Sequence, residues 1–128
     1  ALRSPGSATF NGPGNEVDRA PVTPHYRVAR LTRRQRRELA RRGRTVLRVS
    51  ATARGGIDVK ATARIRRRNA VVARARSWVR PGAATRVPLA LSRQARSVLR
   101  TKRRLRLVIT VTYSEADRVA RQVVMLRG

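Results

Sequence analysis

From Tyr26 onward, apolar and polar side chains alternate along most of the chain. In one stretch Ile57, Val59 and Ala61 alternate with Asp58 and Lys60. A period of two is typical of strands that bury one face. It predicts seven strands, at residues 25–31, 45–54, 57–66, 70–80, 84–91, 104–114 and 118–127. In the last of these, both alternating sets mix apolar and polar residues, so the pattern does not tell which set is buried.

Two segments break this alternation and predict short helices. Residues 32–42 begin with a Thr-x-x-Gln capping box and stop at Gly43, and residues 92–101 begin at a serine cap. The two segments match each other at an offset of 60, as in Leu39 and Leu99, which indicates either an internal repeat or one local solution used twice. Seven strands without a regular strand–helix rhythm predict an all-β fold, a seven-stranded immunoglobulin-like β-sandwich with two crossover helices.

Three features of the sequence carry further expectations about the strands. Gly55-Gly56 lies between two alternating runs and predicts that they form a hairpin. Pro88 predicts that its strand lies at a sheet edge, because proline cannot donate to a neighbouring strand. Trp78 falls on the polar side of its strand, in phase with neighbouring arginines. It would either stack on a ligand or pack against those arginines, unless a bulge turns it inward.

Composition divides the chain into two parts. Residues 1–24 are rich in proline and glycine without an apolar period, which predicts a linker or flexible arm, and residues 25–128 form the predicted domain. The chain is 41% hydrophobic, enough to bury a core, and it has no cysteine for a disulfide or thiolate metal site. No stretch reaches the roughly 18 apolar residues of a membrane span.

Part of the sequence resembles a known class of modules. Residues 87–112 read VPLALSRQARSVLRTKRRLRLVITVT, and the preceding VVARAR and Pro81-Gly82 are similar as well. This segment resembles the arginine-rich immunoglobulin-like repeat modules of exported actinobacterial proteins. The resemblance covers residues 65–127 well and residues 26–64 loosely. It implies an exported or surface-attached module, with no catalytic residue to carry over, and the cysteine pair that such modules often contain is absent here.

The charge is the strongest functional signal. The chain has 32 lysines and arginines against six acids, a net charge of +26. In an immunoglobulin-like topology the first, third and fifth connections lie at one end, so their bases should gather there and bind polyanions. These sixteen residues are Arg33, Arg34, Arg36, Arg37, Arg41, Arg42, Arg44, Arg66, Arg67, Arg68, Arg93, Arg96, Arg100, Lys102, Arg103 and Arg104. The opposite end should receive Asp58, Glu115 and Asp117.

No set of residues predicts catalysis, a metal site, a cofactor or a small-molecule substrate. His25 is the only histidine, and the carboxylates form no convincing acid–base pair. We therefore expect a non-catalytic structural or adhesive module at the cell surface or outside the cell. Its partner would be an anionic polymer such as wall polysaccharide, or an acidic neighbouring module. The alternative is a cytoplasmic protein that binds nucleic acid without sequence preference, through phosphate contacts.

Overall fold

Seven strands and two helices make up the computed structural model, which describes residues 24–128. The strands are β2 (Tyr26–Val28), β3 (Arg44–Ala51), β4 (Gly55–Ile65), β5 (Arg68–Val79), β6 (Thr85–Ala90), β7 (Arg104–Tyr113) and β8 (Ala116–Arg127), and the helices are α2 (Arg33–Arg42) and α3 (Arg93–Lys102). The predicted elements are therefore all present, with ends within three residues of the expected ones. The predicted arm, residues 1–24, lies outside the described residues apart from Pro24.

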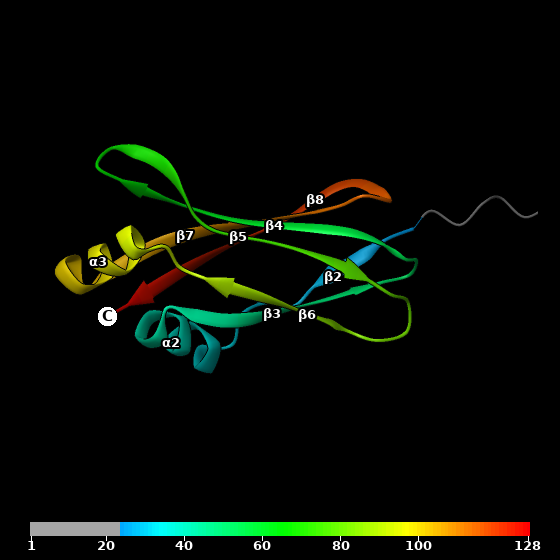
Figure 1. The fold of residues 1–128 in the computed structure, drawn as a ribbon, viewed down its shortest axis with the longest axis horizontal. Helices are drawn as coiled ribbons and strands as arrows, with labels where there is room; N and C mark the ends of the chain where they lie inside the picture. Colours follow the sequence, from blue (N-terminus) through cyan, green and yellow to red (C-terminus); the bar gives the residue numbers. More distant parts are fainter. Residues whose placement is uncertain (1–23) are drawn as a thin grey trace, which may run out of the picture.

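The strands form two antiparallel sheets with a shared core (Figure 1). One sheet has the order β2-β3-β6 and the other the order β5-β4-β7-β8. Alternate side chains of each strand point inward, such as Leu47 from the first sheet and Ile109 from the second, and both are fully buried. Burying this face removes apolar area from water and stabilises the sheet pair. The all-β fold that the alternation predicts is thus confirmed.

The predicted hairpin around Gly55-Gly56 is wrong. β3 pairs with β2 and β6, whereas β4 pairs with β5 and β7, so the connection between β3 and β4 crosses from one sheet to the other. Both glycines lie inside β4, where they allow close packing. A Cβ on Gly55 would stand 2.6 Å from Cε1 of the buried Tyr113 ring, closer than the packed interior tolerates. The ring of Trp78 rests over Gly56, its partner across the strands.

A bulge in β5 changes which side chains that strand buries. The register with β4 shifts between Ala61 and Thr62, so Val72 and Ala73 are both buried and Val71 faces solvent. Strict alternation places Val71 on the apolar side, and the extra residue reverses that assignment. The Val72 carbonyl accepts a 2.7 Å hydrogen bond from Ser92 N, which ties β5 to the start of α3. Beyond the bulge the predicted phase holds, and Trp78 is 60% exposed.

Each of the four sheet edges is modified against further strand pairing. Pro88 lies in β6, at the edge of its sheet and opposite Val46, as predicted. At the opposite edge of that sheet, β2 is only three residues long. The bulge interrupts β5, and the Gln122 side chain on β8 bonds the backbone of the segment that joins β2 to α2. Such devices keep edges from pairing with other chains.

The two helices are built alike but connect different strands. Thr32 closes the predicted capping box of α2, and Ser92 caps α3 through Ala95 N. The C-caps, Gly43 and Arg103, stand at the same offset of 60 and both adopt left-handed backbone conformations. α2 joins strands of one sheet, whereas α3 joins β6 of one sheet to β7 of the other. The match is therefore one of local structure and not of topology.

Candidate polyanion-binding pole

The sixteen predicted bases lie on three connections that meet at one end of the molecule. α2, α3 and the β4–β5 turn occupy the same end in Figure 1, beside the C-terminus. We call this set of sixteen residues the basic pole. Contact between its parts is direct at one point, because the Arg96 side chain of α3 lies over Gly43 at the end of α2. Segments more than 20 residues apart in the sequence thus contribute to one charged surface.

Each helix is held by a few apolar residues and presents its bases to solvent. α2 buries Leu39, and α3 buries Ala95 and Leu99. Neither helix has an acidic residue in its first turn, where a carboxylate would favour the helix dipole. Arg33 and Arg93 stand there instead, and a cation at that end is unfavourable. The basic residues in the last turns, such as Arg41 and Lys102, are favourable in the same field.

Three arginines of the pole occupy backbone positions that usually hold glycine or asparagine. Arg66 and Arg67 form the two-residue β4–β5 turn with φ of 52° and 67°. Positive φ at both positions is the type I′ pattern, which favours Asn-Gly. Arg103 caps α3 with φ 66°, where the equivalent cap of α2 is Gly43 with φ 75°. Each left-handed arginine costs roughly 1–2 kcal/mol.

The bases of the pole have no carboxylate partners among residues 24–128. The ion pairs in this part of the chain join Asp58 to Arg74 at 3.2 Å and to Arg76 at 3.9 Å, outside the pole. Glu38, the acid on α2, accepts a 2.8 Å hydrogen bond from Thr45 Oγ1. Arg36 donates to the Leu31 carbonyl at 3.0 Å. The remaining guanidinium groups of the pole are therefore open to an external anion.

A groove of about 1140 Å³ lies between α3 and the adjoining ends of β4 and β7, and it provides a place for such an anion. Its floor includes Ile65, Val98 and Leu105, and its walls carry the hydroxyls of Ser97 and Thr101. Six bases line it: Arg64, Arg66, Arg93, Lys102, Arg104 and Arg106. Arginine guanidinium groups form bidentate hydrogen bonds with phosphate, sulfate and carboxylate.

Sequence reasoning missed two members of this groove, Arg64 and Arg106. They lie inside β4 and β7, whereas the prediction considered only the connections between strands. Both stand on the polar side of their strands, close to the end that carries the pole. That combination of alternation and position was the signal that could have found them.

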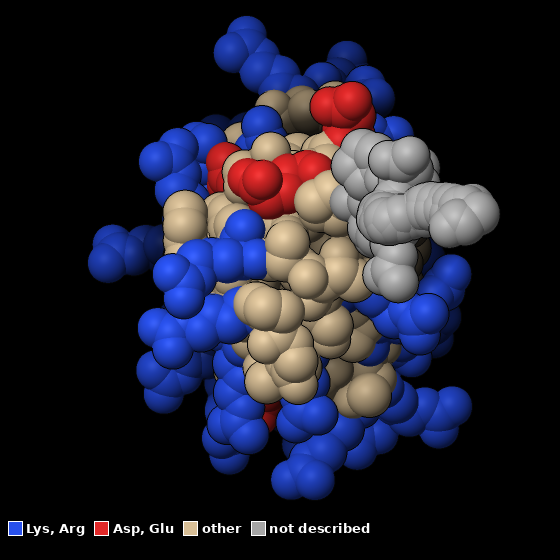
Figure 2. Space-filling view, turned by 90° about the vertical axis from the view of Figure 1, so that its right-hand side faces the viewer, with Lys and Arg blue, Asp and Glu red and all other residues tan. Residues whose placement is uncertain are grey.

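The opposite end of the molecule differs in charge. Figure 2 shows carboxylates and uncharged residues at its centre, with bases around the rim. Glu115 and Asp117 belong to the β7–β8 connection and the start of β8, and Asp58 lies near the start of β4. The predicted concentration of acids at this end therefore agrees with the arrangement of the strands.

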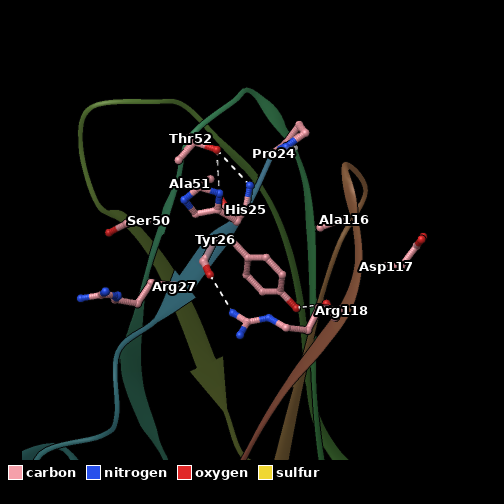
Figure 3. Close-up of a pocket in the computed structure, with 10 residues that line it drawn as sticks. All are labelled: Pro24, His25, Tyr26, Arg27, Ser50, Ala51, Thr52, Ala116, Asp117 and Arg118. Carbon is pink, nitrogen blue, oxygen red and sulfur yellow. Dashed lines mark hydrogen bonds between the residues drawn. The ribbon is translucent and has the colours of Figure 1, made fainter. Parts of the chain in front are cut away.

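A second hollow, of about 960 Å³, lies at this end where β2, β3 and β8 approach one another (Figure 3). Its polar groups bond one another. The Tyr26 hydroxyl accepts the Ala120 N–H at 2.9 Å and faces the carbonyls of Val111 and Arg118. Arg118 returns a 3.1 Å hydrogen bond to the Tyr26 carbonyl, and its guanidinium lies 5.7 Å from the ring centroid. These bonds join β2 of the three-stranded sheet to β7 and β8 of the four-stranded sheet. We call this line of contact around Tyr26 the seam.

Tyr113, which packs 5.1 Å from the Tyr26 ring, provides a prediction about alkaline pH. Burial raises the pKa of its hydroxyl, and the nearby Glu115 carboxylate adds to the rise. Because the folded state holds this proton more tightly, the neutral Tyr113 hydroxyl stabilises the fold fully below the unfolded pKa near 10. That stabilisation is lost as the pH rises above 10 toward the raised pKa of the folded state. In thermal unfolding between about pH 9 and pH 11, Tyr113→Phe should lose less stability than the wild type. Parallel losses in both proteins would contradict the prediction.

Between residues 24 and 128 no three His, Cys, Asp or Glu side chains are grouped so that they could hold a metal ion. Neither helix in that range is long and apolar enough to cross a membrane. In comparisons with known proteins, no family model and no curated protein matches the sequence. The convergence of the three basic connections is therefore the feature of the molecule that indicates a function.

Proposed function

We propose that this chain is a non-catalytic immunoglobulin-like module of an exported or surface-attached protein, whose basic pole contacts anionic polymers. The natural contact would be wall polysaccharide in the cell envelope, or an acidic neighbouring module. One observation carries the proposal: three connections converge at one end, and no carboxylate of the described residues pairs with their bases. Concentrated positive charge raises the local concentration of polyanions and speeds their association.

The order of the strands supports an immunoglobulin-like module. β2-β3-β6 corresponds to strands A, B and E of that fold, and β4-β7-β8 corresponds to C, F and G. β5 pairs with β4 and so extends the second sheet, whereas the fourth strand of a constant-type domain joins the first sheet. The segment that resembles exported arginine-rich modules spans β6, α3 and most of β7.

The strained arginines support a selected role for the charge. A genome that favours arginine codons explains arginine in place of lysine on a surface. It does not explain why arginine stands at positions 66, 67 and 103. The positive φ at these positions suits glycine, and an arginine there destabilises the fold. Strain of this kind persists where function requires it. We infer that anion contacts at the pole offset the lost stability.

The described aromatic residues favour a polymer recognised by its charge. Tyr26 and Tyr113 are buried, and Trp78 stands at the end of β5 away from the pole. The pole therefore offers no described aromatic ring on which nucleic-acid bases could stack, and stacking is a main source of affinity for single strands. In the alternative, a cytoplasmic protein would bind nucleic acid through phosphates alone.

Fluorescence anisotropy distinguishes these functions. A labelled random-sequence duplex and an acidic polysaccharide of matched charge density are titrated at roughly 50 to 300 mM salt, where several phosphate contacts give a log–log slope of roughly −4 to −8 for the duplex. Polysaccharide binding at physiological salt that equals or exceeds duplex binding supports the envelope module. Tighter duplex binding at physiological salt supports the nucleic-acid alternative. Failure to bind either polymer at the lowest salt contradicts both.

A further inference from the structure

Within residues 24–128, the large apolar side chains that are exposed all lie on the outer face of one sheet. They belong to the two edge strands of the four-stranded sheet, β5 and β8. On β5 these are Val71 and Trp78, and on β8 they are Val119, Val123 and Met125. Isolated exposed apolar residues are common, but a set confined to one face marks an interaction surface.

The register of the strands joins part of this set into a continuous row. Val71 pairs with Thr62, Thr62 with Val108, and Val108 with Val123. Paired residues share a face of the sheet, so the row crosses all four strands. Val71 and Val123 at its ends are 51% and 55% exposed, and Val108 between them is half-buried. We call this row of three valines and one threonine the aliphatic stripe.

Bases stand on both sides of this stripe. The neighbouring row toward the acidic end runs from Arg74, which is ion-paired with Asp58 on the same face, through Lys60 and Thr110 to Arg121. On the other side, Arg106 pairs with Met125 and Arg64 pairs with Asn69. The long stems of such side chains cover apolar surface while their charged ends reach outward.

The two outer faces of the molecule differ in one respect. The three-stranded sheet also presents bases on its outer face, such as Arg44, Arg48 and Arg86. Its apolar members there are the half-buried Val46 and the exposed Pro88 and Ala90, and none of the exposed large apolar residues lies on it. Among residues 24–128, only the outer face of the four-stranded sheet therefore combines positive charge with large exposed apolar side chains.

We propose that this face binds the surface of an anionic lipid bilayer. A second copy of the chain is a poor occupant, because it would bring two basic faces together. An anionic bilayer attracts each base near its surface and accepts apolar side chains at the depth of its headgroups. Trp78 at one end of the face is a residue type that favours this interface. The face lies outside the sixteen residues of the basic pole and borders the groove at Arg64 and Arg106.

Trp78 is the only tryptophan of the chain and lies on the proposed face, so its fluorescence reports contact directly. The full chain is mixed with vesicles of phosphatidylcholine containing about 30% phosphatidylglycerol, and with vesicles of phosphatidylcholine alone. We expect a blue shift of the emission with the anionic vesicles and quenching by brominated acyl chains. We expect no shift when a soluble acidic polysaccharide or DNA binds at the pole.

A double variant tests the aliphatic stripe. Val71→Ser with Val123→Ser should lower the vesicle partition coefficient about tenfold, because two apolar side chains leave the interface. Val46→Ser, on the basic face of the other sheet, is the matched control and should leave partition unchanged. Circular dichroism and thermal unfolding establish that both proteins are folded. The double variant should still bind polysaccharide and DNA like the wild type.

Three results would overturn the proposal. The chain could fail to bind anionic vesicles at low salt, or bind them without a shift or quenching of Trp78. It could also keep its affinity in the double variant, which would leave an acidic protein as the better partner for this face. None of these results tests the function proposed for the basic pole. That function would be contradicted by a failure to bind soluble polyanions.

Discussion

Replacing Arg66 and Arg67 by Asn and Gly is expected to stabilise the protein and to weaken its binding of polyanions at the same time. Both arginines have positive φ in a two-residue turn, and Asn-Gly suits that geometry. Relief of two strained positions should add about 1–3 kcal/mol to the free energy of unfolding, a rise of roughly 5–15 °C in Tm. Chemical denaturation and calorimetry measure this gain.

The same substitution removes two charges from the pole. Loss of two phosphate contacts should make the log–log salt slope for duplex DNA shallower by about 2 and lower the affinity at low salt about tenfold. Arg27→Asn with Arg48→Gln, on the outer face of β2 and β3, is a control of equal charge. If that control weakens binding as much as the turn variant, the pole is not a distinct site and only net charge matters.

Removing the Tyr26 hydroxyl is expected to open the seam between the two sheets. The hydroxyl accepts from Ala120 N and lies 2.9 Å from the Val111 carbonyl, and the Tyr26 side chain is buried. Tyr26→Phe leaves these backbone groups without their partner, which should cost about 2–3 kcal/mol. Urea denaturation measures the change in the free energy of unfolding.

Tyr113→Phe is the matched comparison for this effect. The Tyr113 hydroxyl donates to a single acceptor, the Ala53 carbonyl. Its loss should cost about 1 kcal/mol, the typical net value of one hydrogen bond. Equal destabilisation by both substitutions would contradict the larger contribution that we expect from the three-way contact of the Tyr26 hydroxyl.

The positions of strands and helices could be predicted because their signals are local. Alternation of apolar side chains defines a strand, and the Thr32 and Gly43 caps define α2 without reference to the rest of the chain. The pairing of strands is not local, and there the prediction failed at Gly55-Gly56. A glycine pair resembles a turn in the sequence, but these glycines serve the approach of the Tyr113 and Trp78 rings.

The part of the candidate site that depends only on the order and direction of the strands could be predicted from the sequence. Placing alternate connections at one end was sufficient to group the sixteen bases. The groove also includes Arg64 and Arg106, because strand residues beside a connection face the same space. The turn at Arg66 and Arg67 has none of the glycine or asparagine that announces a type I′ geometry, so its strain could be found only in the structure. The exposure of Val71 depended on a bulge that alternation cannot reveal.

The protected edges have a consequence for the behaviour of the protein when its charge is neutralised. Mutual repulsion at +26 keeps free copies apart, and a bound polymer removes much of that repulsion while crowding many copies along its length. Pro88, the bulge at Val72 and the side-chain bonds of Gln122 then remain as barriers to strand exchange between neighbours. Dense coating of a polymer should accordingly leave each copy a separate, reversible particle that salt can release, without growth of cross-β aggregates.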